Sequence, residues 1–97
     1  MENRKTNLIT KEKLENYLKI TKKAFEIAKK KMNKKKKKEA DLIIEMVSCY
    51  LTDAKYFKTE NRVVDAFACI NYAHGWIDAG ARLGIFNVKN NNLFVIE

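Results

Sequence analysis

The sequence contains no proline and only three glycines, so it has few of the residues that usually end helices. Because the strict alternation of apolar and polar residues that marks strands is also missing, a β-sheet protein is disfavoured and an all-helical body is predicted. No stretch approaches the roughly 20 apolar residues of a membrane span, and the amino terminus lacks the apolar run of a signal peptide. We therefore expect a cytoplasmic protein that makes no contact with a membrane.

Histidine and cysteine are also scarce. The single histidine, His74, and the two cysteines, Cys49 and Cys69, match no zinc-binding spacing, so neither a metal nor another cofactor is predicted. The cysteines would lie nearly level on neighbouring antiparallel helices, whose axes are about 8–10 Å apart. This separation usually holds the two Cα atoms too far apart for a disulfide. We expect two buried, free thiols.

The net charge of +8 is concentrated in one region, because Lys29–Lys31 and Lys34–Lys38 together account for the whole excess. One interpretation is non-specific nucleic-acid binding through the run from Lys29 to Lys38. However, no aromatic residue lies within this run and no base-reading motif is present. The other interpretation is therefore a local cluster of solvated lysines with no binding role. The residues that would contact phosphates are Lys34, Lys35, Lys36, Lys37 and Lys38.

Apolar residues recur every three to four positions in three segments, which predicts three amphipathic helices. The first begins after Thr10 as its N-cap, the second covers about 38–58, and the third covers about 62–83 with Gly84 just beyond its end. Short connections near residues 33 and 60 predict an all-α, up-down-up three-helix bundle. We expect one domain over residues 1–97, with a core at about 10–84, a mobile terminus at 1–7 and an apolar C-terminal tail at 85–97.

The third predicted helix is apolar on two sides, so we expect it to be covered on both and to pack between the other two. Trp76 is then a core anchor. Gly75 and Gly80 lie inside this helix, where glycine is unfavourable by about 1 kcal/mol, and they predict close approach of a neighbouring helix or of the tail. The alternative is a groove that accepts a partner's helix or a flat ligand. The first stripe contains Val63, Phe67, Ile70, Ala73, Ile77 and Ala81, and the second Val64, Ala68, Tyr72, Trp76, Ala79 and Leu83.

A short polar row occupies the rest of this helix, and antiparallel pairing with the second helix would place Glu45 level with His74. One hypothesis is a small-ligand or anion site in which a carboxylate orients His74 and Arg82 holds an anion. The other is an interhelical polar network that fixes the register of the helices. No nucleophile lies at motif spacing beside His74, so catalysis is not predicted. The row consists of Asn71, His74, Asp78 and Arg82.

These residues also carry a resemblance. ADLIIEMVSCYLTDAKYF (40–57), VVDAFACINYAHGWIDAGARLGIF (63–86) and the closing LFVIE are similar to an archaeal family known as domain of unknown function 357. The resemblance implies a three-helix bundle of the spectrin-like or albumin-binding-like class and no assigned activity. The family's polar positions match Asp53, His74, Asp78 and Arg82. Where relatives tend to have a Gly-Asp turn, this chain has Glu60-Asn61.

The excess of apolar surface and the lack of a catalytic motif favour a protein–protein interaction or assembly module. The predicted partner is a second copy of this chain or another protein, and a homodimer would form through the third helix and the LFVIE segment at 93–97. Nucleic-acid binding by the lysine run and a ligand site at His74, Asp78 and Arg82 are the two alternatives.

Overall fold

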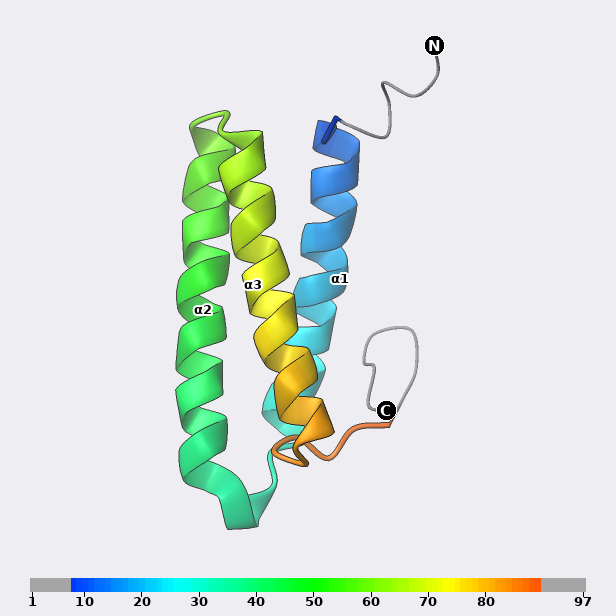
Figure 1. Cartoon of the computed structure of the whole chain (residues 1–97), viewed down its shortest axis with the longest axis vertical. Coiled ribbons are helices and arrows are strands. Elements are labelled where there is room, and N and C mark those ends of the chain that lie inside the picture. The colour runs from blue at the N-terminus through cyan, green and yellow to red at the C-terminus, as the bar shows by residue number, and fades with distance from the viewer. Residues whose placement is uncertain (1–7, 90–97) are drawn as a thin grey trace.

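The computed structural model describes residues 8–89 and contains three α-helices in an up-down-up arrangement (Figure 1). These are α1 (Lys11–Lys30), α2 (Lys37–Thr59) and α3 (Val63–Arg82), and a short 3-10 turn, η2 (Lys34–Lys36), precedes α2. The predicted all-α three-helix bundle is confirmed. The expectations for residues 1–7 and for the apolar tail at 93–96 lie outside the described residues.

The ends of the helices follow from local chemistry. The Thr10 hydroxyl accepts a hydrogen bond from the backbone N–H of Lys13 at 3.0 Å and caps α1 as predicted. Asn61, in the turn before α3, has a left-handed φ of 60°, a conformation that asparagine tolerates better than most residues. Gly84 follows α3 with φ of 72°, which matches its predicted place just past the helix end.

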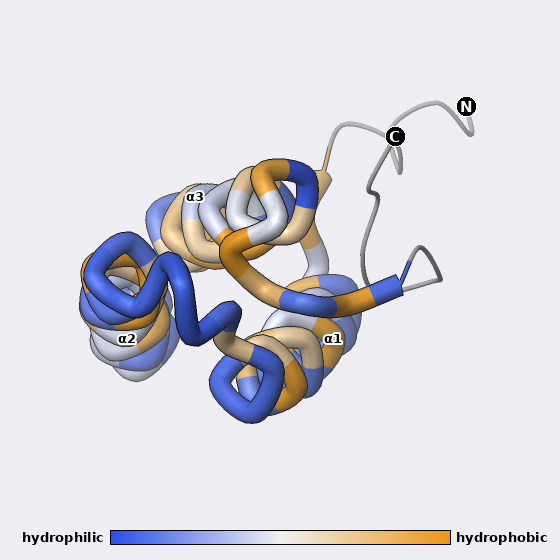
Figure 2. Tube along the Cα trace, turned by 90° about the horizontal axis from the view of Figure 1, so that it is seen from below, coloured by the Kyte–Doolittle hydropathy of each residue, from blue (hydrophilic) through white to orange (hydrophobic). Residues whose placement is uncertain are grey.

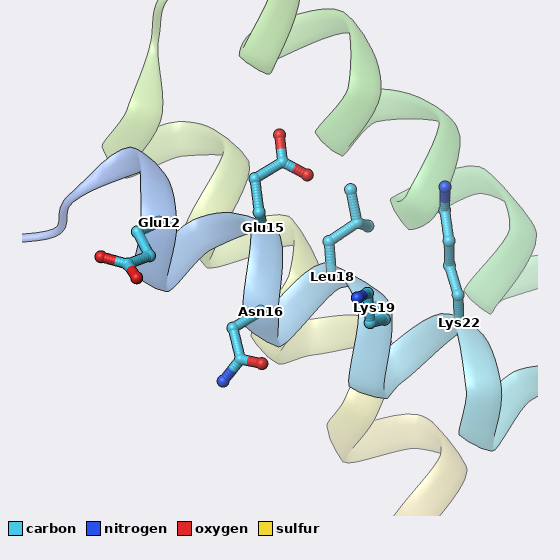
Figure 3. A pocket seen from close by; sticks show the side chains of 6 residues that line it. All are labelled: Glu12, Glu15, Asn16, Leu18, Lys19 and Lys22. Carbon is cyan, nitrogen blue, oxygen red and sulfur yellow. The ribbon is translucent and has the colours of Figure 1, made fainter.

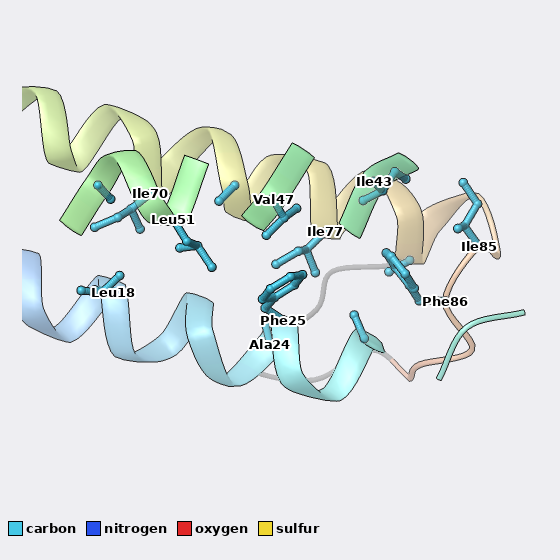
Figure 4. Close-up of a cluster of buried hydrophobic side chains, with 14 of the residues drawn as sticks. Leu18, Ala24, Phe25, Ile43, Val47, Leu51, Ile70, Ile77, Ile85 and Phe86 are labelled. Carbon is cyan, nitrogen blue, oxygen red and sulfur yellow. The ribbon is translucent and has the colours of Figure 1, made fainter. Parts of the chain in front are cut away.

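The core lies along the first apolar stripe of α3, which packs extensively on α2 and less extensively on α1, whereas α1 and α2 contact each other little. Figure 2 shows the three helices from the end of the bundle, and Figure 4 shows side chains of all three converging between them. The buried residues of the first two helices complete the core: Leu14, Leu18, Ala24, Phe25 and Ala28 of α1, and Ala40, Ile43, Val47, Leu51 and Ala54 of α2. The largest fully buried side chains are Phe86, Leu14, Ile70, Ile77 and Val47.

The segment after α3 closes one end of the bundle. Phe86 is 1% exposed, and its backbone forms an isolated antiparallel bridge with Met32 in the α1–α2 connection. Asn33 supports the same junction, because its side-chain amide donates to the Gly84 carbonyl at 2.9 Å and its backbone N–H donates to the Ile85 carbonyl at 2.9 Å. The core therefore extends beyond residue 84 and includes the first residues of the predicted tail.

The second stripe of α3 is exposed within residues 8–89, so the prediction that this helix packs between the other two, with one of them on each apolar side, is wrong. Val64 is 70% exposed, Leu83 is 63% exposed, and Trp76, the predicted core anchor, is 37% exposed. The physical reason is that α1 and α2 both pack against the same side of α3. Within residues 8–89, no further element covers the opposite side.

The two cysteines are free, as predicted, but only one of them is shielded. Cys69 is partly buried, and burial, reinforced by the nearby carboxylates of Asp53 and Asp65, raises the pKa of its thiol. Cys49 is exposed, so its predicted burial is wrong. It lies outside the α2 stripe that faces the core.

The two helical glycines differ in their surroundings. A Cβ atom added to Gly80 would lie 2.5 Å from Cε2 and 2.7 Å from Cδ2 of the Phe86 ring. A Cβ atom added to Gly75 would meet nothing within 4 Å. The predicted close approach is therefore confirmed at Gly80, where the neighbour is the segment after α3, and is wrong at Gly75.

We expect Gly80→Ala to destabilise the protein and Gly75→Ala to stabilise it. The first forces Phe86 out of a filled site at a cost of about 1–3 kcal/mol. The second removes the helix penalty of an open glycine and gains roughly 0.5–1 kcal/mol. Chemical denaturation of both variants at low protein concentration checks this pair. Equal shifts in the free energy of unfolding would contradict the assignment of Gly80 as the packing site.

Candidate functional site

Three surface features contain the residues singled out by the sequence: a polar hollow between α1 and α3, the lysine-rich end of the bundle, and the exposed face of α3. In the hollow, the hydroxyl of Thr21 on α1 forms a hydrogen bond with Nδ1 of His74 on α3 at 3.1 Å. The other ring nitrogen, Nε2, lies 3.7 Å from Oδ1 of Asp78. These three side chains therefore link α1 to α3, whose contact is smaller than the contact between α2 and α3.

The hollow itself has a volume of about 410 Å³ and is amphipathic. Tyr17 forms part of its rim and stacks on Phe67 with ring centroids 5.1 Å apart. Asp78 Oδ1 is buried and has no hydrogen-bond partner among the described residues, since 3.7 Å exceeds hydrogen-bond distance. The lining residues are Tyr17, Ile20, Thr21, Ile70, Asn71, His74, Gly75 and Asp78.

The structure brings only part of the predicted polar set together. Asn71, His74 and Asp78 line the same hollow, whereas Arg82 and Glu45 do not. The hydroxyl that contacts His74 comes from α1, although the sequence suggested a carboxylate from α2.

The remaining acidic residues of the predicted set lie elsewhere on α2. Asp53 and Glu45 are both exposed. Asp41, one turn before Glu45, pairs with Lys37 at 2.8 Å.

Sequence reasoning missed Thr21 as a site residue. The register of α1 against α3 does not follow from the α2–α3 hairpin, because a longer connection and another helix intervene. One signal was present: Thr21 is a polar residue within the apolar stripe of α1, and it is 2% exposed. A buried hydroxyl needs a hydrogen-bond partner, which here is His74.

A second hollow, of about 480 Å³, lies along α1 and is surrounded by charged side chains (Figure 3). Glu15 reaches toward α2 and pairs with Lys58, while Glu12 and Asn16 point away. Lys22 also extends toward α2, and desolvation together with the nearby lysines Lys55 and Lys58 lowers its pKa. These groups spread over the surface and do not converge on one point, so the hollow offers no defined chemistry.

The lysine run forms η2 and the first turn of α2. Lys36 donates through Nζ to the carbonyl of Leu83 at 2.7 Å, and Lys37 forms the ion pair with Asp41. Two of the five lysines thus bind groups of their own chain. Lys34, Lys35 and Lys38 are exposed to solvent.

The exposed apolar face of α3, called the α3 face below, is the third feature. Tyr72 lies in the middle of it and stacks on Tyr50 of α2, with ring centroids 5.5 Å apart. Shallow hollows of about 330 and 370 Å³ adjoin Tyr72. The face consists of Val64, Ala68, Tyr72, Gly75, Trp76, Ala79 and Leu83.

Fold and surface together define, within residues 8–89, a small all-α bundle with an uncovered apolar helix face. A family model described as protein of unknown function (DUF357) matches residues 16–86, which is most of the chain. The protein belongs to this family. Comparison with curated proteins and with solved structures gives no significant match.

Neither a membrane-spanning helix nor a cluster of metal ligands occurs within residues 8–89. None of the three helices is long and apolar enough to cross a membrane. No group of three or more His, Cys, Asp and Glu side chains there is placed to hold a metal ion.

We expect the hydrogen bond between Thr21 and His74 to contribute to stability as a pair. Thr21→Val keeps the side-chain volume but removes the hydroxyl, so it should cost about 1 kcal/mol. In a His74→Leu background the same change should cost close to nothing, because the partner is already absent. A double-mutant cycle by urea denaturation measures this coupling. An equal cost in both backgrounds would show that the contact contributes no pairwise energy.

Proposed function

We propose that this protein is a non-catalytic association module whose α3 face binds another protein surface. The observation that carries the proposal is the continuous row of exposed apolar side chains on α3, from Val64 through Tyr72 and Trp76 to Leu83. Contiguous apolar patches on soluble proteins typically mark interaction surfaces. A single exposed leucine is common on protein surfaces and needs no functional explanation, whereas an entire apolar helix face does.

The composition of the α3 face supports the same proposal. Tyrosine and tryptophan are the residues that most often dominate interface energies, and here Tyr72 and Trp76 lie at the centre of the face. The shallow hollows beside Tyr72 leave room for side chains of a partner. The ends of the face carry charged residues, Asp65 near the start of α3 and Arg82 at its last turn, which resembles the polar rim of protein interfaces.

The two alternative functions have weaker support. For nucleic-acid binding, Lys36 and Lys37 already interact within the chain, which reduces the number of lysines available to phosphates. For ligand binding, Thr21 and His74 satisfy each other, and Arg82 does not line the hollow that they share. Neither alternative explains why the α3 face is apolar.

We expect light scattering across concentration and salt series to show self-association that persists at high salt, because apolar contacts are not screened. The double variant Tyr72→Ser/Trp76→Ser should abolish it. Its cost to the stability of the single chain includes the loss of the Tyr72–Tyr50 stacking, about 0.5–1.5 kcal/mol, so its folding is checked by chemical denaturation at low protein concentration. Tyr56→Ser is the matched control, because Tyr56 is a similarly exposed tyrosine on α2. A wild-type protein that remains monomeric at every concentration would contradict the proposal.

A further inference from the structure

We propose that the surface bound by the α3 face is the α3 face of a second copy, packed antiparallel about a two-fold axis beside residues 73 and 74. This inference rests on the proposed function and adds the identity of the partner, its direction and its register. It is carried by three properties of the described residues: the spacing of the exposed side chains, the position of the charges, and the open space at Gly75.

Six of the seven residues of the α3 face form pairs that are symmetric about its midpoint, and Trp76, whose counterpart is Asn71, is the exception. Val64 and Leu83 are equally far from the midpoint between residues 73 and 74, and so are Ala68 and Ala79. In a two-fold dimer the same patch serves both copies, so each residue must face a compatible one. Antiparallel packing at this register places the large apolar side chains at the two ends opposite each other. The small alanines, which allow close approach, face each other nearer the axis.

The centre of the face is complementary in size. Tyr72 and Gly75 are also equally far from the midpoint, and Gly75 has open space where a side chain would be. The tyrosine ring of one copy can therefore lie over the glycine of the other. The proposal also accounts for Gly75, which no intramolecular packing explains.

Charge selects the antiparallel direction. Lys36 binds the carbonyl of Leu83, so the lysine run lies at the C-terminal end of α3. A parallel dimer would bring two such runs together. An antiparallel dimer separates them by about the 30 Å length of α3, which exceeds the roughly 8–10 Å over which charges interact at moderate ionic strength.

The size of the face indicates how tightly the dimer holds together. One side of a 20-residue helix is about 30 Å long and roughly 10 Å wide. Such a contact is smaller than the interfaces of stable complexes and is typical of weak, transient association. The dimer should therefore dissociate on dilution.

Cysteine crosslinking tests the direction and the register. In a Cys49→Ser/Cys69→Ser background, Val64→Cys and Leu83→Cys place single thiols at opposite ends of the α3 face. A mixture of the two variants, treated with a short bismaleimide, should give a crosslinked dimer that joins one chain of each kind. Either variant alone should give none, because identical residues would be about 28 Å apart along the axis. Both positions are highly exposed in the single chain, so the substitutions should not disturb the fold.

The outcomes separate this inference from the proposed function. Crosslinking of Val64→Cys with itself would show a parallel dimer. A dimer detected by light scattering that gives no crosslink in any sample would show another register or another surface. Either result overturns the inference, while self-association stands. A wild-type monomer at all concentrations overturns the proposed function.

The fluorescence of the unmodified protein provides a second measurement. Trp76 is the only tryptophan, so its emission should shift to shorter wavelength as the dimer forms. Dimerisation without such a shift would place the interface away from the α3 face and overturn the inference.

Discussion

The constraint on which the rest of the structure depends is that one side of α3 serves as the packing surface for two helices that hardly contact each other. Ile70, Ala73 and Ile77 are fully buried along this side. Small residues such as Ala66, Ala73 and Ala81 let the helices approach closely. Because both neighbours occupy the same side, neither covers the opposite side of α3, and a hollow lined by both helices lies between α1 and α3. The exposed face and the polar hollow are thus two results of one arrangement.

The closure at the end of the bundle shows how a chain with three helices completes its core. Phe86 fills the space at the end of α3 that no helix reaches, and Gly80 makes room for its ring. Asn33 fixes the position of this segment through two hydrogen bonds to backbone carbonyls. Residues that sequence patterns assign to a loop and a tail therefore act as structural parts of the core.

Much of the fold was predictable from the sequence, since the apolar periodicity, the Thr10 cap and the role of Gly84 depend on local chemistry. The exposure of the second α3 stripe was not, because periodicity shows that a face is apolar but not whether another element covers it. Trp76 is the clearest case, because it was predicted to be a core anchor and is 37% exposed. The site was predicted less well: His74 and Asp78 were identified, but the partner Thr21 depends on the α1–α3 register, which involves residues far apart in sequence.

The lysine run at the start of α2 has a consequence for how ionic strength affects the fold. Five lysines gather where the helix dipole is already positive, so they repel both one another and the helix end. The bond from Lys36 to the Leu83 carbonyl draws one of these charges onto the C-terminal end of α3, which favours positive charge. Dissolved salt screens the repulsion among these lysines. Salt also weakens the exposed ion pairs, but each of these contributes little to the stability of the folded state. Ions of the solvent thus stabilise this end of the bundle, and the folded state should become more stable as their concentration rises.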